Sequence, residues 1–256
     1  MTPAHKIAFY TLLRREIRRF IRIWPQTLLP PAITMTLYFV IFGNLIGSRI
    51  GDMAGISYIN YIAPGIIMMA VINNAYANVA SSFFSAKFQN HIEELLVAPI
   101  PNYLILAGYV AGGVARGLLT GFIVTCVALC FTSLSIEYIT VTIAIILLSA
   151  ILFALGGFIN AIYANSFDEV AIIPTFILTP LTYLGGIFYS IDLLPDFWQQ
   201  ASLFNPILYM VNTFRYGIIG ISDIPIGFAF GFIILCIIAL TWYALYLLQK
   251  GTGIRH

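Results

Sequence analysis

The chain has 256 residues, of which 61% are hydrophobic and only 9% are charged, and its formal net charge is +2. A soluble globular domain carries about 25% charged residues, so this composition excludes a soluble fold. It predicts an all-α, polytopic integral membrane protein with a single transmembrane domain over residues 1–256. The three cysteines lie inside apolar runs, which favours neither a disulfide framework nor a metal site.

The first 24 residues predict an interfacial helix on the cytoplasmic face of the membrane. Apolar and basic side chains recur on opposite helical faces, and a helix divided in this way lies in the membrane surface rather than across it. Since no small-residue cleavage pattern follows, we expect the helix to be retained. The apolar face comprises Leu13, Ile17, Phe20, Ile21 and Trp24, and the polar face comprises Arg14, Arg15, Arg18, Arg19 and Arg22 with Glu16 among them.

Six apolar runs are each long enough to cross a bilayer, which takes about 20 residues. The fifth contains Pro174 and Pro180 and ends in Gly185 and Gly186, so we expect it to be kinked. The predicted spans cover residues 26–46, 58–85, 102–131, 138–163, 170–189 and 225–248.

Polar side chains within the second and third spans form a candidate translocation path. Asn74, Asn78 and Ser81 recur at helical spacing, and such a stripe faces either another helix or a water-filled path. Arg116 lies deep in the glycine-rich third span, where an arginine costs at least about 2.5 kcal/mol. It therefore needs a partner or a cavity. Either it forms a structural ion pair with Asp168 or Glu169, or it has a substrate or gating role.

Residues 87–99 form a short amphipathic segment between the second and third spans. Phe88, Ile92, Leu95, Leu96 and Pro99 recur on one helical face, and acidic and amide side chains populate the other. One interpretation is a solvated linker that lies on lipid. The other is a handle through which a cytosolic partner moves the two flanking spans.

Residues 190–223 are apolar but interrupted, and they match neither a span nor an ordinary loop. The pair Asn205-Pro206 is typical of a helix start, with an N-cap followed by proline at the first helical position. We expect two short re-entrant helices that meet at this break and dip into the outer leaflet. Irregular backbone at that depth is tolerated only where protein buries it or where it lines a cavity.

The distribution of basic residues predicts the orientation of the chain. With both termini in the cytoplasm, nine of the twelve Lys and Arg residues lie on the cytoplasmic side. Cytoplasmic loops of membrane proteins carry such an excess. We therefore expect a multi-pass membrane protein with both termini cytoplasmic.

Two stretches carry a resemblance to a known family. One is EELLVAPIP after the second span, and the other is LGGIFYSIDLLPDFWQQASLFNPILYMVNTFR on the outer side. Together they resemble ABC-2-type exporter permeases, in which a glycine-rich span end is followed by spaced prolines, an aromatic or polar residue and an arginine. The matching positions are Gly185, Gly186, Pro195, Pro206, Tyr209 and Arg215.

The resemblance implies the membrane subunit of an ATP-driven exporter in the bacterial inner membrane. Such permeases form dimers and bind two separate ABC ATPase subunits, which hold ATP and Mg. This chain itself would bind no cofactor or metal and would not be an enzyme. Its further partner would be membrane lipid, and it would bind no nucleic acid. The 256 residues contain no GxxxxGK[ST] phosphate loop. The resemblance makes residues 87–99 the coupling helix, with Lys87, Phe88, Ile92, Glu93, Glu94, Leu95, Leu96 and Pro99 as the ATPase-coupling residues.

Other functions stay open at this point. An ion-gradient-driven secondary transporter or channel would use ionisable residues at mid-membrane, of which Arg116 is the clear example. A membrane-embedded enzyme lacks a visible constellation, because His5, His91 and His256 are dispersed. A passive scaffold would leave the amphipathic and outer segments without a purpose. The cargo, whether drug, lipid or glycan, does not follow from the sequence.

Overall fold

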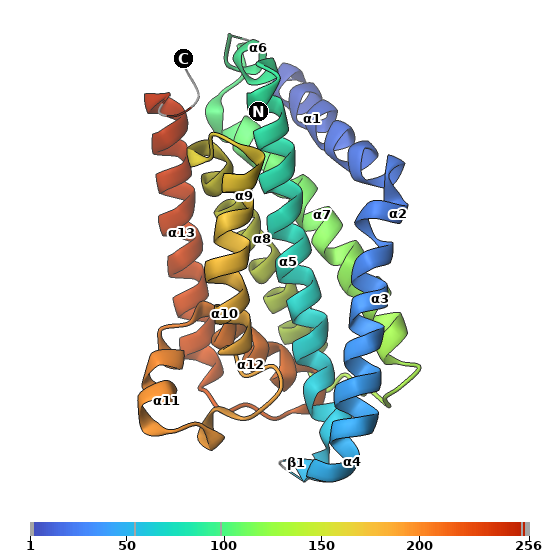
Figure 1. The fold of residues 1–256 in the computed structure, drawn as a ribbon. Coiled ribbons are helices and arrows are strands. Elements are labelled where there is room, and N and C mark those ends of the chain that lie inside the picture. Colours follow the sequence, from blue (N-terminus) through green and yellow to red (C-terminus); the bar gives the residue numbers. More distant parts are fainter. Residues whose placement is uncertain (1–2, 54, 98, 252, 254–256) are drawn as a thin grey trace.

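The structure, a computed structural model, describes residues 3–53, 55–97, 99–251 and 253; the side chains of Asn44, Glu93 and Leu96 lie outside this description. The described residues form an elongated helical bundle with one two-stranded hairpin (Figure 1). Its elements are, in order, α1 (Pro3–Arg22), α2 (Trp24–Thr27), α3 (Leu29–Tyr38), the π-helix η1 (Phe39–Ile46), α4 (Gly47–Ile50), β1 (Asp52–Met53), β2 (Ile56–Ser57), α5 (Tyr58–Phe88), α6 (His91–Val97), α7 (Asn102–Ala128), α8 (Ile139–Tyr163), α9 (Phe167–Ile173), the π-helix η2 (Pro174–Leu178), α10 (Thr179–Tyr183), the 3-10 helix η3 (Ile191–Leu193), α11 (Asp196–Leu203), α12 (Pro206–Ile219) and α13 (Ile226–Lys250).

Five helical stretches of the described residues are long and apolar enough to cross a membrane. Four of them follow the predicted spans closely, and the fifth joins α2, α3, η1 and α4 over Trp24–Ile50, where residues 26–46 were predicted. The predicted fifth span, residues 170–189, does not meet the same criterion. In this segment α9, η2 and α10 follow one another without a break, and together they are shorter than a span, which takes about 20 residues.

Prolines explain the irregular path of that segment. Pro174 is the C-cap of α9 and the first residue of η2, and Pro180 lies in the first turn of α10. Each proline lacks the N–H that a regular helix would use, so the hydrogen-bond pattern shifts at these points. The helix then ends before Gly185 and Gly186, and residues 184–190 form turns and bends. The expected kink is confirmed, and the predicted end at residue 189 is wrong.

The helix α5 is the centre of the bundle, and it packs between α7 and α8 (Figure 1). In its most apolar window 83% of the residues are buried, compared with 17% for α13. A helix buried on all sides needs no amphipathic pattern, and α5 accordingly has apolar side chains all round, such as Ile62, Ile66 and Val79. The exposed apolar surface lies on the outer helices, where Phe228, Leu235 and Trp242 of α13 are examples.

Glycines let the backbones of neighbouring helices approach α5 and α7 closely. On α7, a Cβ added at Gly113 would lie 2.5 Å from Val79 Cγ2, and one at Gly121 would lie 2.6 Å from Val71 Cγ2. Small residues at helix contacts of membrane proteins have this role. On α8, a Cβ at Gly157 would meet the backbone carbonyl oxygen of Tyr76 well inside contact distance.

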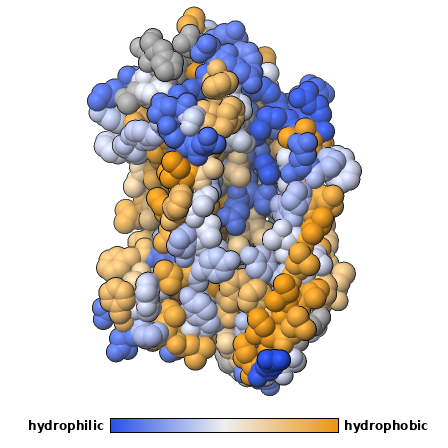
Figure 2. Space-filling model, viewed as in Figure 1, coloured by the Kyte–Doolittle hydropathy of each residue, from blue (hydrophilic) through white to orange (hydrophobic). Residues whose placement is uncertain are grey.

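The two ends of the bundle differ in composition. The α1–α6 end carries α1, α6 and the end of α13, and the α11–α12 end carries α11, α12 and the β1–β2 hairpin (Figure 1). Hydrophilic side chains gather at the α1–α6 end, whereas hydrophobic side chains cover α3 (Figure 2). This distribution is typical of a protein with its middle in lipid and one basic end in water.

We expect Gly157→Ala to lower the apparent unfolding temperature of the purified protein in detergent. The added methyl group would press on the Tyr76 carbonyl, which is backbone and cannot rotate away, and overpacking of this kind costs about 1–3 kcal/mol. The adjacent Gly156→Ala is the matched control, because its Cβ would lie 3.7 Å from the Tyr76 ring, an ordinary contact. Equal unfolding temperatures for the two variants would contradict this account of the α5–α8 contact.

Candidate functional sites at the two ends of the bundle

A buried carboxylate joins α1 to α5 at the α1–α6 end. Glu16 is 1% exposed, and its Oε2 accepts a hydrogen bond of 2.5 Å from the Ser82 hydroxyl on α5. Arg15 Nη2 lies 3.3 Å from Glu16 Oε1, and Arg19 Nε lies 3.5 Å from Oε2. Arg15 also donates to the Tyr109 hydroxyl on α7. Because a buried charge is costly without partners, these contacts fix the position of α1 on the bundle.

Two glycines of α7 make room for this arrangement. A Cβ added at Gly108 would lie 2.9 Å from Leu12 Cβ, and one added at Gly112 would lie 2.5 Å from Glu16 Cβ. Any larger residue at either position would push α1 away from α7. The sequence pattern had placed Glu16 among the arginines of a solvated face, and the structure instead turns it inward.

Burial and neighbouring charges act in opposite directions on the two arginines. Burial lowers the pKa of Arg19, and the nearby Glu16 carboxylate offsets only part of this effect. Burial also acts to lower the pKa of Arg15, but Tyr109 and Glu16 beside it raise that pKa above its ordinary value. Since an arginine pKa lies far above neutral, both guanidinium groups stay positively charged at any physiological pH.

The predicted polar stripe of α5 meets the arginines of the neighbouring helices. Arg19 Nη2 donates to Asn78 Oδ1 and to the Asn78 carbonyl oxygen, each at 2.9 Å. Arg116 Nη2 donates to Asn74 Oδ1 at 3.1 Å and to the Thr27 carbonyl oxygen at 3.4 Å. The hydroxyl of Ser81 instead bonds to the carbonyl oxygens of its own helix. The stripe therefore provides helix-to-helix hydrogen bonds; its role in a translocation path stays a prediction.

Among the described residues, Arg116 forms no ion pair with Asp168 or Glu169, which was one of the two alternatives for this residue. Within the described part of the chain, the two hydrogen-bond acceptors of Arg116 are neutral oxygens. Both acidic residues lie in the first turn of α9, where Glu169 accepts hydrogen bonds from the backbone and side chain of Asn165. Carboxylates are favoured at a helix N-terminus, so local structure holds these acidic residues away from α7.

The predicted coupling segment divides into two helices. α5 continues to Phe88, and α6 begins at His91. Between them Asn90 adopts a φ of +59°, a left-handed conformation that asparagine tolerates better than most residues. The expected single helix over residues 87–99 is therefore interrupted at Asn90, and the change of direction places α6 at the tip of the bundle (Figure 1).

Lys87 attaches this segment to the bundle. Its ammonium group donates to the carbonyl oxygens of Ile162 and Ala164, at 2.7 and 2.8 Å, and the residue is only 8% exposed. Ile162 is one of the last residues of α8, whose terminal carbonyls have no partner within the helix. A cation is favoured at that position. Lys87 therefore caps α8 and is not presented to solvent.

The other residues assigned to the segment divide between an inner and an outer face. Ile92 is 1% exposed and packs into the apolar core, and Leu95 is half-buried. Phe88, Glu94 and Pro99 are exposed, and Phe88 forms an aromatic cluster with Phe84 and Phe167. The side chains of Glu93 and Leu96, also assigned to this segment, lie outside the described part of the structure. The surface that α6 presents to solvent is thus mixed polar and apolar.

The motif at the α11–α12 end converges on Arg215. This residue is fully buried, and it donates to the Gly186 carbonyl at 2.6 Å, to the Tyr61 carbonyl at 3.3 Å and to Asn212 Oδ1 at 3.3 Å. Its guanidinium also lies 4.0 Å from the centre of the Tyr61 ring. Gly186 has a φ of +68°, which directs its carbonyl toward Arg215 at little conformational cost. Arg215 thereby joins α12 to α5 and to the turn after α10.

The remaining motif residues shape the two short helices. Asn205 is the N-cap of α12, accepting a hydrogen bond from the Ile207 N–H at 3.0 Å, and Pro206 is the first helical residue. The expected break at Asn205-Pro206 is confirmed. Pro195 precedes α11, and Tyr209 donates from its hydroxyl to the Leu203 carbonyl at 2.7 Å. A Cβ added at Gly185 would lie 2.7 Å from Ile207 Cγ2, so Gly185 permits close packing of α12.

Nothing in the described part of the chain suggests a metal centre, since no group of three or more His, Cys, Asp or Glu side chains gathers there. The contacts described at the two ends of the bundle are suited to holding neighbouring helices together and to transmitting movement from one helix to the next. It defines a polytopic helical membrane domain with one basic, mostly hydrophilic end.

Comparison with known proteins places this domain in a family. A family model described as ABC-2 type transporter matches residues 7–219. The inner membrane transport permease YadH of Escherichia coli (strain K12) is 56% identical over 255 residues, which covers 100% of each chain. Nodulation protein J of Rhizobium leguminosarum bv. viciae is 22% identical over 219 residues, 85% of each chain. The chain belongs to the ABC-2 type transporter family.

Family membership confirms the resemblance drawn from the two sequence stretches. Membership of this family also implies, in general terms, that the chain works with ABC ATPase subunits. Sequence reasoning did not find the inward position of Glu16 or the cap formed by Lys87. Each of these two contacts depends on a partner far along the chain. For Glu16, the paired spacing of Gly108 and Gly112 was the available signal that another helix approaches α7 at this point.

We expect Arg215→Lys to lower the apparent unfolding temperature. A lysine ammonium cannot reach the Gly186 and Tyr61 carbonyls and the Asn212 side chain together, and each lost hydrogen bond to a buried charge costs about 1.5–3 kcal/mol. Arg49→Lys is the control at the same end, because the Arg49 side chain is exposed. If the Arg215→Lys protein were as stable as the Arg49→Lys protein, the structural role of Arg215 would be contradicted.

Proposed function

We propose that this chain is the membrane-spanning subunit of an ATP-driven exporter, which forms the translocation path as a dimer and is driven by two separate ABC ATPase subunits. The observation that carries this proposal is the position of α6. It is a short helix at the tip of the most buried span, and it exposes Glu94 and Val97 at the basic end of the bundle.

The contacts of α6 are suited to transmitting force into the membrane. Ile92 anchors α6 in the apolar core, and Lys87 ties the end of α5 to the end of α8. A displacement of α6 would therefore move both α5 and α8. In this proposal an ATPase docks on the exposed residues of the segment, with Phe88, Glu94 and Pro99 among them.

The charge distribution supports placing the α1–α6 end in the cytoplasm. α1 carries Arg14, Arg15, Arg18, Arg19 and Arg22, and basic residues concentrate on the cytoplasmic side of membrane proteins. Both termini would then be cytoplasmic. The name of the E. coli relative, an inner membrane transport permease, supports a multi-pass location in the bacterial inner membrane.

We also propose that the run α9–η2–α10 is a sixth crossing and that α11 and α12 re-enter the outer leaflet. The run is short for a full span, and the segments that follow it would complete the crossing. The side chains of α12 are mostly buried, including Asn212, Thr213 and Arg215. Protein burial of this kind is what permits irregular structure at membrane depth.

The candidate path lies along Asn74, Asn78, Ser81 and Arg116. Asn78 and Asn74 already accept hydrogen bonds from Arg19 of α1 and Arg116 of α7. A path would therefore open only when α1 or α7 moves away from α5. ATP-driven movement of α6 and α5 would supply that change. The chemical class of the cargo does not follow from these residues.

We expect Glu94→Lys to weaken co-purification of the ABC ATPase by about tenfold, because charge reversal in an interface converts attraction into repulsion. Glu94 is exposed on α6, so insertion and stability should be unchanged. Glu137→Lys makes the same charge change in an exposed residue beside the α11–α12 end and should leave ATPase binding as it is.

Reconstitution tests the energy source. ATP hydrolysis and transport that require the ATPase, and that fall with Glu94→Lys, would support the proposal. Ion-gradient-driven transport by the purified chain alone would contradict it and would favour the alternative, a secondary transporter or channel.

A further inference from the structure

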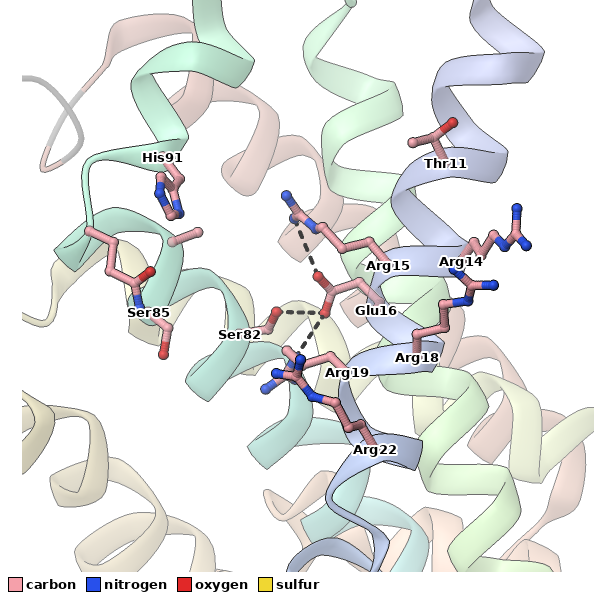
Figure 3. A pocket seen from close by; sticks show the side chains of 12 residues that line it. Thr11, Arg14, Arg15, Glu16, Arg18, Arg19, Arg22, Ser82, Ser85 and His91 are labelled. Carbon is pink, nitrogen blue, oxygen red and sulfur yellow. Dashed lines mark hydrogen bonds and ion pairs between the residues drawn. The ribbon is translucent and has the colours of Figure 1, made fainter.

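A basic cavity of about 780 Å³ opens between α1, the end of α5 and the start of α6. Figure 3 shows it from close by, with α1 on one side and the α5–α6 turn on the other. Eleven of its twelve lining residues carry hydrogen-bonding side chains. The lining residues are Thr11, Arg14, Arg15, Glu16, Arg18, Arg19, Arg22, Ser82, Ser85, Ala86, Gln89 and His91.

The positive charge of this cavity is not neutralised by the residues that line it. Their single carboxylate, Glu16, is already bound by Arg15, Arg19 and Ser82. Within the described part of the chain, neither Arg18 nor Arg22 forms an ion pair with a carboxylate. Several guanidinium groups close together repel one another, so an anion that entered the cavity would relieve this repulsion.

Donors approach the cavity from two sides. Arg15 and Arg19 extend from α1 toward Ser82, whereas His91 and Ser85 lie on the opposite wall, and Arg14 and Arg18 project on the side of α1 away from Ser82 (Figure 3). A guanidinium presents a planar set of N–H donors that matches the oxygens of a phosphate group. Hydroxyl, amide and imidazole groups on the other wall could donate to the remaining oxygens.

Large apolar side chains are exposed on α1 and at the start of α2. Tyr10 and Ile21 of α1 and Trp24 of α2 are 67%, 48% and 56% exposed, and an amphipathic helix buries such residues in the lipid surface. This position would bring the cavity to the level of lipid headgroups. Basic pockets at that level bind anionic headgroups.

We propose that this cavity binds a phosphate-bearing anion, which bridges the arginines of α1 and the donors of the α5–α6 turn. The phosphate would come from the headgroup of an anionic phospholipid or from a phosphorylated solute. The inference goes beyond the proposed function and needs no ATPase. Bound anion would link α1 to the first residue of α6, so its occupancy would set how firmly the two helices are held together.

The test uses the full chain, purified in a neutral detergent without the ATPase. Three probes are titrated separately in a fluorescence-labelled binding assay at low salt: short-chain phosphatidylglycerol, short-chain phosphatidylcholine and inorganic phosphate. The test variant is the double substitution Arg15→Gln and Arg22→Gln, and the matching double substitution to Lys keeps the charge. Arg49→Gln removes an exposed arginine outside the cavity.

We expect phosphatidylglycerol to bind wild type and Arg49→Gln alike, and the Gln double variant to bind about tenfold more weakly, with the Lys variant in between. Tighter binding of phosphatidylglycerol than of inorganic phosphate would identify a lipid as the source. Equal arginine-dependent binding of both would identify a phosphorylated solute, and would equally support an anion site.

Three results would overturn the proposal. The first is equal affinity of wild type and the Gln double variant for every probe, with unfolding temperatures that show both to be folded. The second is phosphatidylcholine binding as tight as phosphatidylglycerol binding. The third is absence of binding to all probes combined with loss of ATPase co-purification in the Gln double variant, which would make the cavity a protein docking surface.

Discussion

Close approach of helix backbones around α5 is the constraint on which this structure depends. In a membrane, apolar side chains gain little by leaving lipid for protein, so helices associate through packing and hydrogen bonds. Gly157 brings α8 against the Tyr76 carbonyl, and Gly113 and Gly121 bring α7 against Val79 and Val71. Once the backbones are this close, polar side chains of α5 can reach neighbouring helices.

The polar contacts follow from that packing. Ser82 reaches Glu16, Asn78 reaches Arg19, and Asn74 reaches Arg116, all from one side of α5. Each contact pairs a buried or half-buried charged group with a hydrogen-bonding partner. The same contacts explain why a helix as basic as α1 lies tightly on an otherwise apolar bundle.

Long apolar runs made most of the fold predictable. Four spans begin and end within a few residues of their expected positions, because membrane thickness fixes how many apolar residues a helix needs. Asn205-Pro206 fixed the start of α12 through local chemistry alone. The segment after Pro174 was less predictable, since a proline shows that the helix changes but not how the chain continues.

Site residues were harder to place because their roles depend on partners distant in sequence. The family resemblance assigned Lys87 to the ATPase-coupling residues, whereas the structure places it against the end of α8, 75 residues away in sequence, which it caps. Glu16 likewise looked like one more polar residue among arginines, and its partner Ser82 is 66 residues distant. The left-handed Asn90 divided a segment whose hydrophobic spacing indicated one continuous helix.

Because α5 is long, it connects contacts at the two opposite ends of the bundle. Lys87 near one terminus holds α8, and Tyr61 near the other receives Arg215 of α12. At about 1.5 Å per residue these two positions are about 39 Å apart along the helix axis. A continuous helix with an attachment at each terminus can carry a displacement from one attachment to the other. A small tilt at the basic end would thus reach the opposite membrane surface as a movement of α12.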